Sequence, residues 1–176
     1  MKIKLLILGC FLFFPGICRA EQITSLQVSL FDPLQVCADD YSVDGFRLNI
    51  IYGVNQDVGG VDLGIVNDTR HNAHAFEWGM VNLVKEDFSG FQLGLFNQVR
   101  HDAKGVQLGV LANRTKGSCE GLQASVFFND AKEEMRGVQL GLVNTTGSLY
   151  GLQIGLLNFN DDDKYLGFFP FIHAAF

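Results

Sequence analysis

An eight-residue pattern recurs along this 176-residue chain at a spacing of about 15 residues, and it constrains the fold more than any other feature. Its clearest copies span residues 137–144 and 151–158, with the sequences GVQLGLVN and GLQIGLLN. Earlier copies begin at Gly60, Ala75, Gly90, Gly105 and Gly121, and a degenerate copy begins at Gly45. A repeat of this length indicates one supersecondary unit that is copied in space.

Each copy predicts a β-strand. The second, fourth and sixth positions are apolar, as in Val106, Leu108 and Val110, whereas Gln107 and Gly109 lie between them. Alternation with a period of two is typical of a strand whose two faces meet different surroundings. A polar side chain occupies the third position of successive copies: Asp62, Glu77, Gln92, Gln107, Gln123, Gln139 and Gln153.

Two ways of pairing these strands are compatible with the repeat. In a parallel β-solenoid each copy is one coil, identical residues stack, and the third positions form a ladder. In an antiparallel meander each copy is one strand and one turn. The meander is favoured because connecting segments such as residues 68–74 are mostly polar, which would leave a coil with one apolar side and no core. In addition, residues 70–73 (RHNA) return two copies later as residues 100–103 (RHDA), as expected for turns that alternate between opposite ends of a sheet.

We therefore predict an all-β fold, an antiparallel meander of about ten strands closed as a small β-barrel, with a β-solenoid as the alternative. In the barrel the aliphatic face contacts lipid, and the Gln/Gly face lines the interior together with seventh-position residues such as Val66 and Phe96. Strands of about 9–11 residues match those of outer-membrane barrels, and a last strand ending in Phe176 resembles theirs. This arrangement places Cys37 and Cys119 at opposite ends, too far apart for a disulfide.

The N-terminal residues 1–20 predict a secretory signal peptide. Two lysines precede an apolar run over residues 5–14, and Ala20 is a small residue suited to cleavage. A lipobox at residues 8–10 is an alternative to this signal. With cleavage after Ala20, residues 21–176 form a single β-repeat domain. Cleavage would remove three basic and no acidic side chains, changing the formal net charge from −6 to −9. An acidic chain without an evident basic stripe argues against nucleic acid and against electrostatic docking on anionic lipid.

Candidate residues for catalysis or metal binding are few. Exposed histidines in turns are more often solvated than bound to metal, and no Ser/His/acid spacing of a hydrolase is present. Residues 161–163 (DDD) resemble part of a calcium loop but lack the glycine and the distal glutamate of an EF-hand. We therefore predict no catalytic, cofactor-binding or metal-binding residue, and no enzymatic activity. The residues considered for such roles are His71, His74, His101, Asp102, Ser118 and Ser148.

The tandem GLQIGLLN motif, with the closing segment 167–172 (GFFPFI), resembles a bacterial surface-repeat family first recognised in leptospires. The resemblance covers residues 45–176, although Ser125 replaces a repeat glycine. It implies an exported, surface-associated protein without a known activity, and it transfers no site residue. We therefore expect a surface or outer-membrane protein with a structural or interaction role and with outer-membrane lipid as its partner. The alternatives are a secreted, soluble β-solenoid binding module and, more remotely, a small outer-membrane enzyme.

Overall fold

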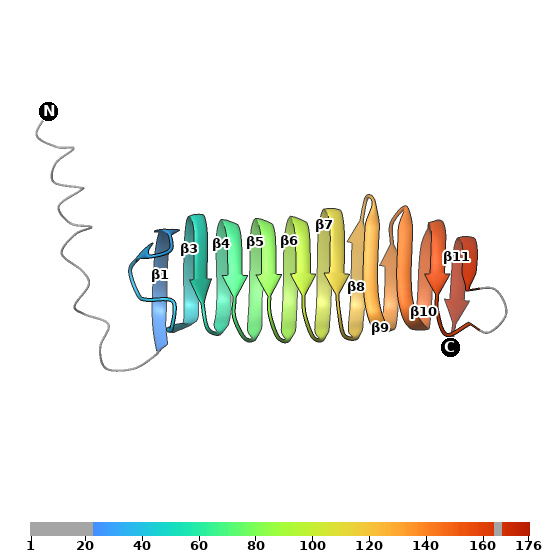
Figure 1. Cartoon of the computed structure of the whole chain (residues 1–176), viewed down its shortest axis with the longest axis horizontal. Helices are drawn as coiled ribbons and strands as arrows, with labels where there is room; N and C mark the ends of the chain where they lie inside the picture. The colour runs from blue at the N-terminus through green and yellow to red at the C-terminus, as the bar shows by residue number, and fades with distance from the viewer. Residues whose placement is uncertain (1–22, 164–166) are drawn as a thin grey trace, which may run out of the picture.

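The computed structural model describes residues 23–163 and 167–176, which form an elongated rod of stacked coils (Figure 1). All of its strands belong to one 11-stranded sheet in the order β11-β10-β9-β8-β7-β6-β5-β4-β3-β1-β2. The strands are β1 (Ile23–Phe31), β2 (Leu34–Gln35), β3 (Ser42–Asn55), β4 (Val58–Thr69), β5 (Ala73–Val84), β6 (Phe88–Val99), β7 (Ala103–Thr115), β8 (Cys119–Ser125), β9 (Phe128–Leu140), β10 (Val143–Asn160) and β11 (Phe168–Ala175).

Successive coils run in the same direction, with equal repeat positions opposite one another. Strand β5 pairs in parallel with both neighbours, so that Glu77 lies opposite Asp62 on one side and opposite Gln92 on the other. Antiparallel pairs occur only at the two ends of the described sheet, between β1 and β2 and between β10 and β11. The predicted all-β repeat fold is confirmed. The antiparallel meander and the closed barrel are wrong, and the alternative β-solenoid is correct.

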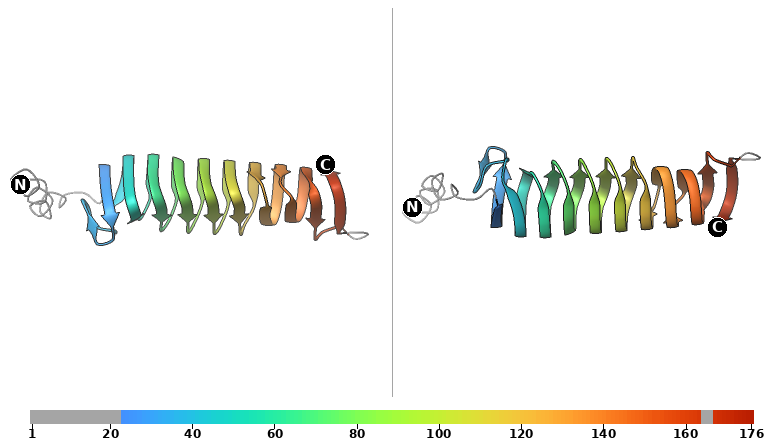
Figure 2. Two further views of the ribbon diagram at one scale, coloured as in Figure 1. Left: turned by 90° about the horizontal axis from the view of Figure 1, so that it is seen from above. Right: turned by 90° about the horizontal axis from the view of Figure 1, so that it is seen from below.

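The turns between coils stack along one edge of the rod, which Figure 2 shows from above and below. The backbone N–H of Glu86 donates to the carbonyl of His71 at 3.1 Å, and the N–H of His101 donates to the carbonyl of Glu86 at 3.4 Å. The likeness between residues 70–73 and 100–103 therefore does not reflect turns at opposite ends of a sheet. Both segments lie on the same edge, with one further turn between them.

Each coil bends once within the repeat, and this bend decides which residues face inward. In β5 the side chains of Glu77 and Asn82 are buried, whereas Met80 and Val81, which are adjacent in sequence, both point outward. The alternation shifts by one residue at this point. The seventh-position residues Val66 and Phe96 consequently lie outside the coil, so their predicted place on the inner face is wrong.

The connecting segments supply the apolar core that the sequence analysis did not find. Each exposed turn is flanked by two inward residues, for example Thr69 before and Ala73 after one turn, and Val84 before and Phe88 after the next. These residues stack from coil to coil, so a segment that is mostly polar still buries both of its ends. The central apolar cluster consists of Ala73, Val84, Phe88, Val99, Ala103, Cys119, Ala131, Met135 and Leu149.

Glycine opens most copies because the backbone adopts a positive φ there and the coils approach closely. At Gly105 φ is +122°, and a Cβ atom would lie 2.1 Å from the carbonyl oxygen of Gly90 in the preceding coil. A side chain at this position would therefore clash with backbone in a conformation that L-residues rarely adopt. The first residue of the repeat thus keeps the coils in contact.

Cys119 is a free, buried thiol, so it forms no disulfide with Cys37, as predicted. The physical reason differs from the one expected, because the two residues lie several coils apart along the rod and not at opposite ends of a barrel. The predicted signal peptide, residues 1–20, lies outside the described residues. Among the residues that are described, no helix has the length and apolar character needed to cross a membrane.

Candidate functional site: a polar core and an apolar belt

A ladder of glutamine amides runs along the inside of the rod. In five consecutive coils the Nε2 of each glutamine donates to the side-chain oxygen of the residue one coil nearer the N-terminus, at 2.7–2.8 Å. At the C-terminal end, Nδ1 of His173 lies 3.2 Å from Oε1 of Gln153. Because the equal positions are one coil apart and in register, each buried amide finds its partner in the next coil. The expected glutamine ladder of the solenoid alternative is therefore present.

The asparagines that end each copy form a second ladder. From Asn67 to Asn144, each Nδ2 donates to the Oδ1 of the asparagine one coil nearer the C-terminus, at 2.7–2.9 Å. Asn49, a fifth-position residue opposite Gly64, joins the N-terminal end by donating to Asn67 at 2.8 Å. The other Nδ2 hydrogen donates to a backbone carbonyl, as from Asn97 to Leu108 at 2.9 Å. The amides of the two ladders point in opposite directions along the rod. Their dipoles therefore oppose each other, so the two ladders together carry little net dipole. Most of their polar atoms are paired; Asn49 Oδ1 and Glu77 Oε1 are exceptions among the described residues.

Charged residues replace glutamine near the N-terminal end of the first ladder. Arg47, Asp62 and Glu77 occupy three consecutive coils and are fully buried. The guanidinium of Arg47 donates from Nε to Oδ1 of Asp62 at 2.8 Å and forms an ion pair with the same carboxylate through Nη2. Glu77 accepts a hydrogen bond from Gln92 through Oε2 at 2.7 Å, but its Oε1 has no hydrogen-bond partner.

The environment of Glu77 favours the neutral carboxyl. Burial, and then the neighbouring Asp62 carboxylate, raise the pKa of Glu77 to about 8, against the opposing effects of Gln92 and Arg47. Burial alone would lower the pKa of Arg47, but the Asp62 carboxylate outweighs it and raises that pKa above its ordinary value. The segment therefore holds one ion pair beside one protonated acid, so its charges compensate.

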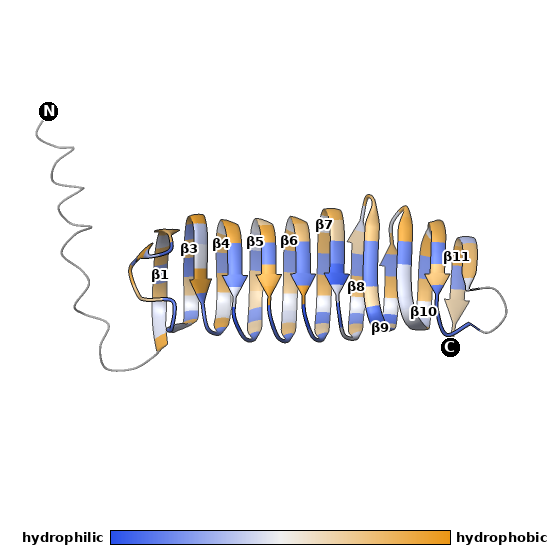
Figure 3. Cartoon of the chain, in the orientation of Figure 1, coloured by the Kyte–Doolittle hydropathy of each residue, from blue (hydrophilic) through white to orange (hydrophobic). Residues whose placement is uncertain are grey.

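The aliphatic side chains of the repeat form a continuous apolar surface on the outside of the rod. We call this surface the apolar belt and define it by the second, fourth, sixth and seventh positions of the eight copies that begin at residues 45 to 151. In β5 these positions hold Phe76, Trp78, Met80 and Val81, and the Trp78 side chain is 58% exposed. Figure 3 shows hydrophobic stretches recurring at the same height in successive coils, above hydrophilic turns. The prediction that the aliphatic face points outward and the glutamines inward is confirmed.

The belt contains no charged side chain at any of its four positions. Neighbouring strands are about 4.8 Å apart, and a strand rises about 3.3 Å per residue. The part of the belt between the second and sixth positions therefore covers on the order of 500 Å² over eight coils. This area is at the upper end of the largest apolar patches on ordinary monomeric proteins, and patches of this kind usually mark an interaction site. The belt is therefore the strongest functional feature of the described chain.

A row of cations, which the sequence analysis missed, lines the turn edge. We call it the basic row: Arg70, Lys85, Arg100, Lys116 and Lys132. Their backbones stack, since the N–H of Lys85, Arg100 and Lys116 donate to the carbonyls of Thr69, Val84 and Val99 in the preceding coils. The sequence contains the signal as cations spaced by 15 or 16 residues. Matching residues 70–73 with residues 100–103 passes over Lys85, which lies in the turn between them. The expectation of no basic stripe is wrong.

Most residues considered for metal binding or catalysis do not converge. His71 and His101 lie on the same edge but two coils apart, with Glu86 between them, and His74 belongs to a different row. Among the described residues, no group of three or more His, Cys, Asp or Glu side chains could hold a metal ion. Residues 161–163 form a turn whose backbone donates to Thr146, Gly147 and Asn160.

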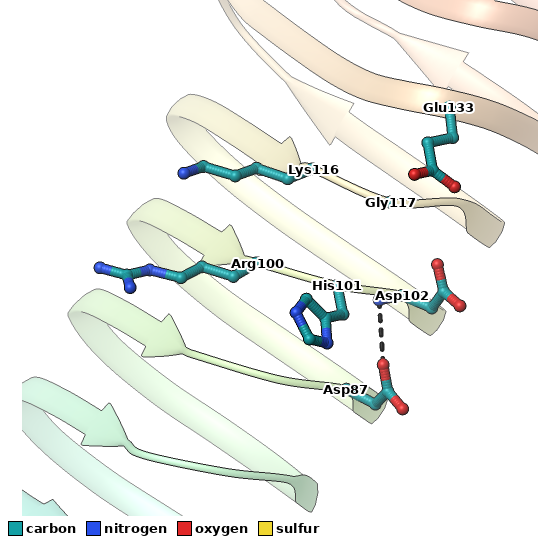
Figure 4. A pocket seen from close by; sticks show the side chains of 7 residues that line it. All are labelled: Asp87, Arg100, His101, Asp102, Lys116, Gly117 and Glu133. Carbon is teal, nitrogen blue, oxygen red and sulfur yellow. Dashed lines mark hydrogen bonds between the residues drawn. The ribbon is translucent and has the colours of Figure 1, made fainter.

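A depression on the turn edge (Figure 4) is lined by Asp87, Arg100, His101, Asp102, Lys116, Gly117 and Glu133. A second depression includes His74, Asp102 and Ser118 in its lining. Ser118 lies beside the first depression, but Oδ1 of Asp102 accepts the backbone N–H of Ser118 at 2.7 Å, not its hydroxyl. Ser148 lies apart, with its hydroxyl against the carbonyl of Glu133. This part of the chain has the hydrogen bonds of a structural turn and lacks the relay that hydrolysis requires.

No protein-family model, curated protein or solved structure matches this chain. The function is therefore argued from the geometry of the belt, the turn edge and the polar core.

Proposed function

We propose that this chain is an exported, non-enzymatic binding module that lies on a lipid surface, with the bacterial outer membrane as its site. The apolar belt carries the proposal. It is long and charge-free, and the remaining circumference of the coil bears the charged turns. A rod with one apolar and one polar side is the β-solenoid counterpart of an amphipathic helix that lies in the membrane interface.

The shape of the belt favours lipid over a rigid protein partner. The belt continues around the bend of each coil, because consecutive residues such as Met80 and Val81 both point outward there. A second folded protein would cover one side of this convex bend and leave the other side in water. Fluid acyl chains can cover both sides, so lipid is the partner that buries the most apolar area.

The buried polar core supports a position of the rod on the membrane surface. The two amide ladders are sealed within the coil and leave the outer polar half free to stay in water. Covering about 500 Å² of apolar surface contributes on the order of 12 kcal/mol before association costs, which themselves reach about 4–15 kcal/mol. We therefore expect reversible binding to membranes. The resemblance to surface-repeat proteins and the predicted signal peptide support the exported location.

The test compares two triple variants in the same three coils, β5, β6 and β7. Trp78→Gln/Leu93→Gln/Leu108→Gln alters the belt, and His74→Gln/Ser89→Gln/Lys104→Gln alters the outward polar row. Binding to phosphatidylcholine vesicles is measured by flotation, and folding is checked by circular dichroism. We expect the belt variant to lose at least about tenfold in affinity, because three apolar side chains no longer enter lipid. Equal flotation of the belt variant and the wild type would contradict the proposal.

A further inference from the structure

The last three cations of the basic row have no ion-pair partner among the described residues. Arg70 pairs with Asp39, and Lys85 pairs with Asp68 at 3.2 Å. Arg100, Lys116 and Lys132 are exposed and form no salt bridge within the described chain. They occupy three consecutive coils, so the backbones of neighbouring cations are only about 4.8 Å apart. Three like charges held this close repel one another, and an anion placed against them would relieve that repulsion.

Three acids in the turns next to Arg100, Lys116 and Lys132 are directed away from these cations, and Asp130, two residues before Lys132, pairs with Arg114 at 3.2 Å. Figure 4 shows Arg100 and Lys116 extending in the same direction, with the carboxylates of Asp87, Asp102 and Glu133 on the other side of the turn. Asp87 accepts the backbone N–H of Asp102 at 3.1 Å through Oδ1, and Asp102 accepts that of Ser118 at 2.7 Å. These two carboxylates stabilise the stacked turns, so they are not free to swing toward the cations.

The opposite margin of the belt differs, although it also carries cations. Lys104 pairs with Glu120 at 3.1 Å, and Arg136 pairs with Glu134 at 2.9 Å. Each cation on that margin already has its own carboxylate. The excess of positive charge is therefore confined to one side of the rod.

The basic row lies close enough to the belt for its side chains to reach the headgroups of lipids that the belt contacts. From Val81, the last belt position in β5, two outward steps lead past Leu83 to Lys85, a backbone distance of about 13 Å. An interfacial element places its apolar face about 5–10 Å into the boundary between headgroups and acyl chains. Long lysine and arginine side chains next to such a face extend toward the headgroups.

We propose that the basic row binds the anionic headgroups of the lipids on which the belt lies, and so selects membranes that carry phosphate-rich, negatively charged lipid. This inference rests on the proposed function and names its lipid class. The formal net charge, −6 for the full chain and −9 after the predicted cleavage, opposes it only weakly, because charges beyond about 10 Å are screened at ordinary salt while adjacent cations are not. The local row therefore decides the attraction.

The experiment compares vesicles of pure phosphatidylcholine with vesicles containing roughly one-third phosphatidylglycerol, at about 0.1 M salt. We expect the wild type to bind the anionic vesicles at least about tenfold more tightly. The variant Lys116→Gln/Lys132→Gln should lose about fivefold per cation on anionic vesicles and nothing on phosphatidylcholine. The control Lys104→Gln/Arg136→Gln makes the same change in net charge and should retain most of the preference.

Several outcomes would overturn the inference. Equal binding of the wild type to both vesicle types would show that the row does not select headgroups, and an equal loss in both double variants would assign the preference to net charge. Displacement by inorganic phosphate beyond the effect of matched sodium chloride would assign the row to the free anion. Binding to phosphatidylcholine alone reports on the belt, so a failure of the proposed function is distinguishable from a failure of this inference.

Discussion

Glu77 is the residue at which the polar core departs most from its own pattern. A glutamine fills the same position in each of the next five coils, and a glutamine there both donates and accepts. A charged carboxylate can only accept, and it would lie next to the Asp62 carboxylate. Protonation restores a donor on Oε1, the atom that lacks a partner. Neutral Glu77 therefore avoids placing a second buried negative charge beside Asp62.

This situation predicts a stability that falls as pH rises. The folded-state pKa of Glu77, about 8, lies above its ordinary value of 4.5, so the folded state holds the proton more tightly than the unfolded state. The contribution is fully present below pH 4.5 and is lost progressively up to about pH 8. Glu77→Gln removes the titrating group and should stabilise the protein by about 5 kcal/mol at pH 8.5, measured by urea unfolding.

The contrast with acidic pH is the control for this prediction. Near pH 4 the wild type and Glu77→Gln should unfold at similar urea concentrations, because the wild-type carboxyl is protonated in both states. A difference between the two proteins that stays constant from pH 4 to pH 8.5 would show that Glu77 does not titrate as described.

At the scale of a strand, the asparagine ladder makes each coil depend on its neighbours. Asn97 in β6 is fully buried, accepts from Asn82 at 2.7 Å and donates to Asn113 at 2.8 Å. Asn97→Ala leaves a buried donor on one side and a buried acceptor on the other, at a cost of about 1–3 kcal/mol each. We expect a loss of about 4 kcal/mol in the free energy of unfolding, measured by urea denaturation.

The adjacent residue provides the matched control. Gln98 has the same chemistry but points outward, so Gln98→Ala should change the free energy of unfolding by less than about 0.5 kcal/mol. Similar losses in the two variants would mean that the buried ladder contributes no more than a surface amide.

The sequence predicted the strands but not how they pair. Alternation such as that from Val106 to Val110 identified the strands and correctly placed the aliphatic side chains outside. The pairing direction was missed because a core was assumed to be apolar. Amides such as Gln107 and Asn97 are satisfied in the interior only if equal positions stack in register, which is a property of the assembled coils. The bend after the sixth residue, which turns Val66 outward, has no local signal in the sequence.

Across the whole molecule, the period of the repeat turns single residues into rows. One apolar position becomes part of a belt, and one cation in each of five turns becomes a basic row. Neither surface can be recognised from a single copy of the repeat. The cations form a row only when every turn lies on the same edge, whereas the predicted meander places alternate turns at opposite ends of the sheet. The absence of catalytic residues remains a prediction of the sequence, since the structure offers a binding surface and does not test activity.

The central claim is that the coils stack in parallel along an open rod, and distances between spin labels test it most directly. Labels are placed on the outward polar row, with one label kept at His74 and the other at Lys104, Glu120, Arg136 or Tyr150. The solenoid predicts distances that rise steadily by about 4.8 Å per coil, from about 10 Å for Lys104 to about 24 Å for Tyr150. In an antiparallel barrel, equal repeat positions lie at alternating ends of successive strands. Distances that alternate between short and long, or that level off at the barrel diameter and do not rise steadily, would therefore contradict it.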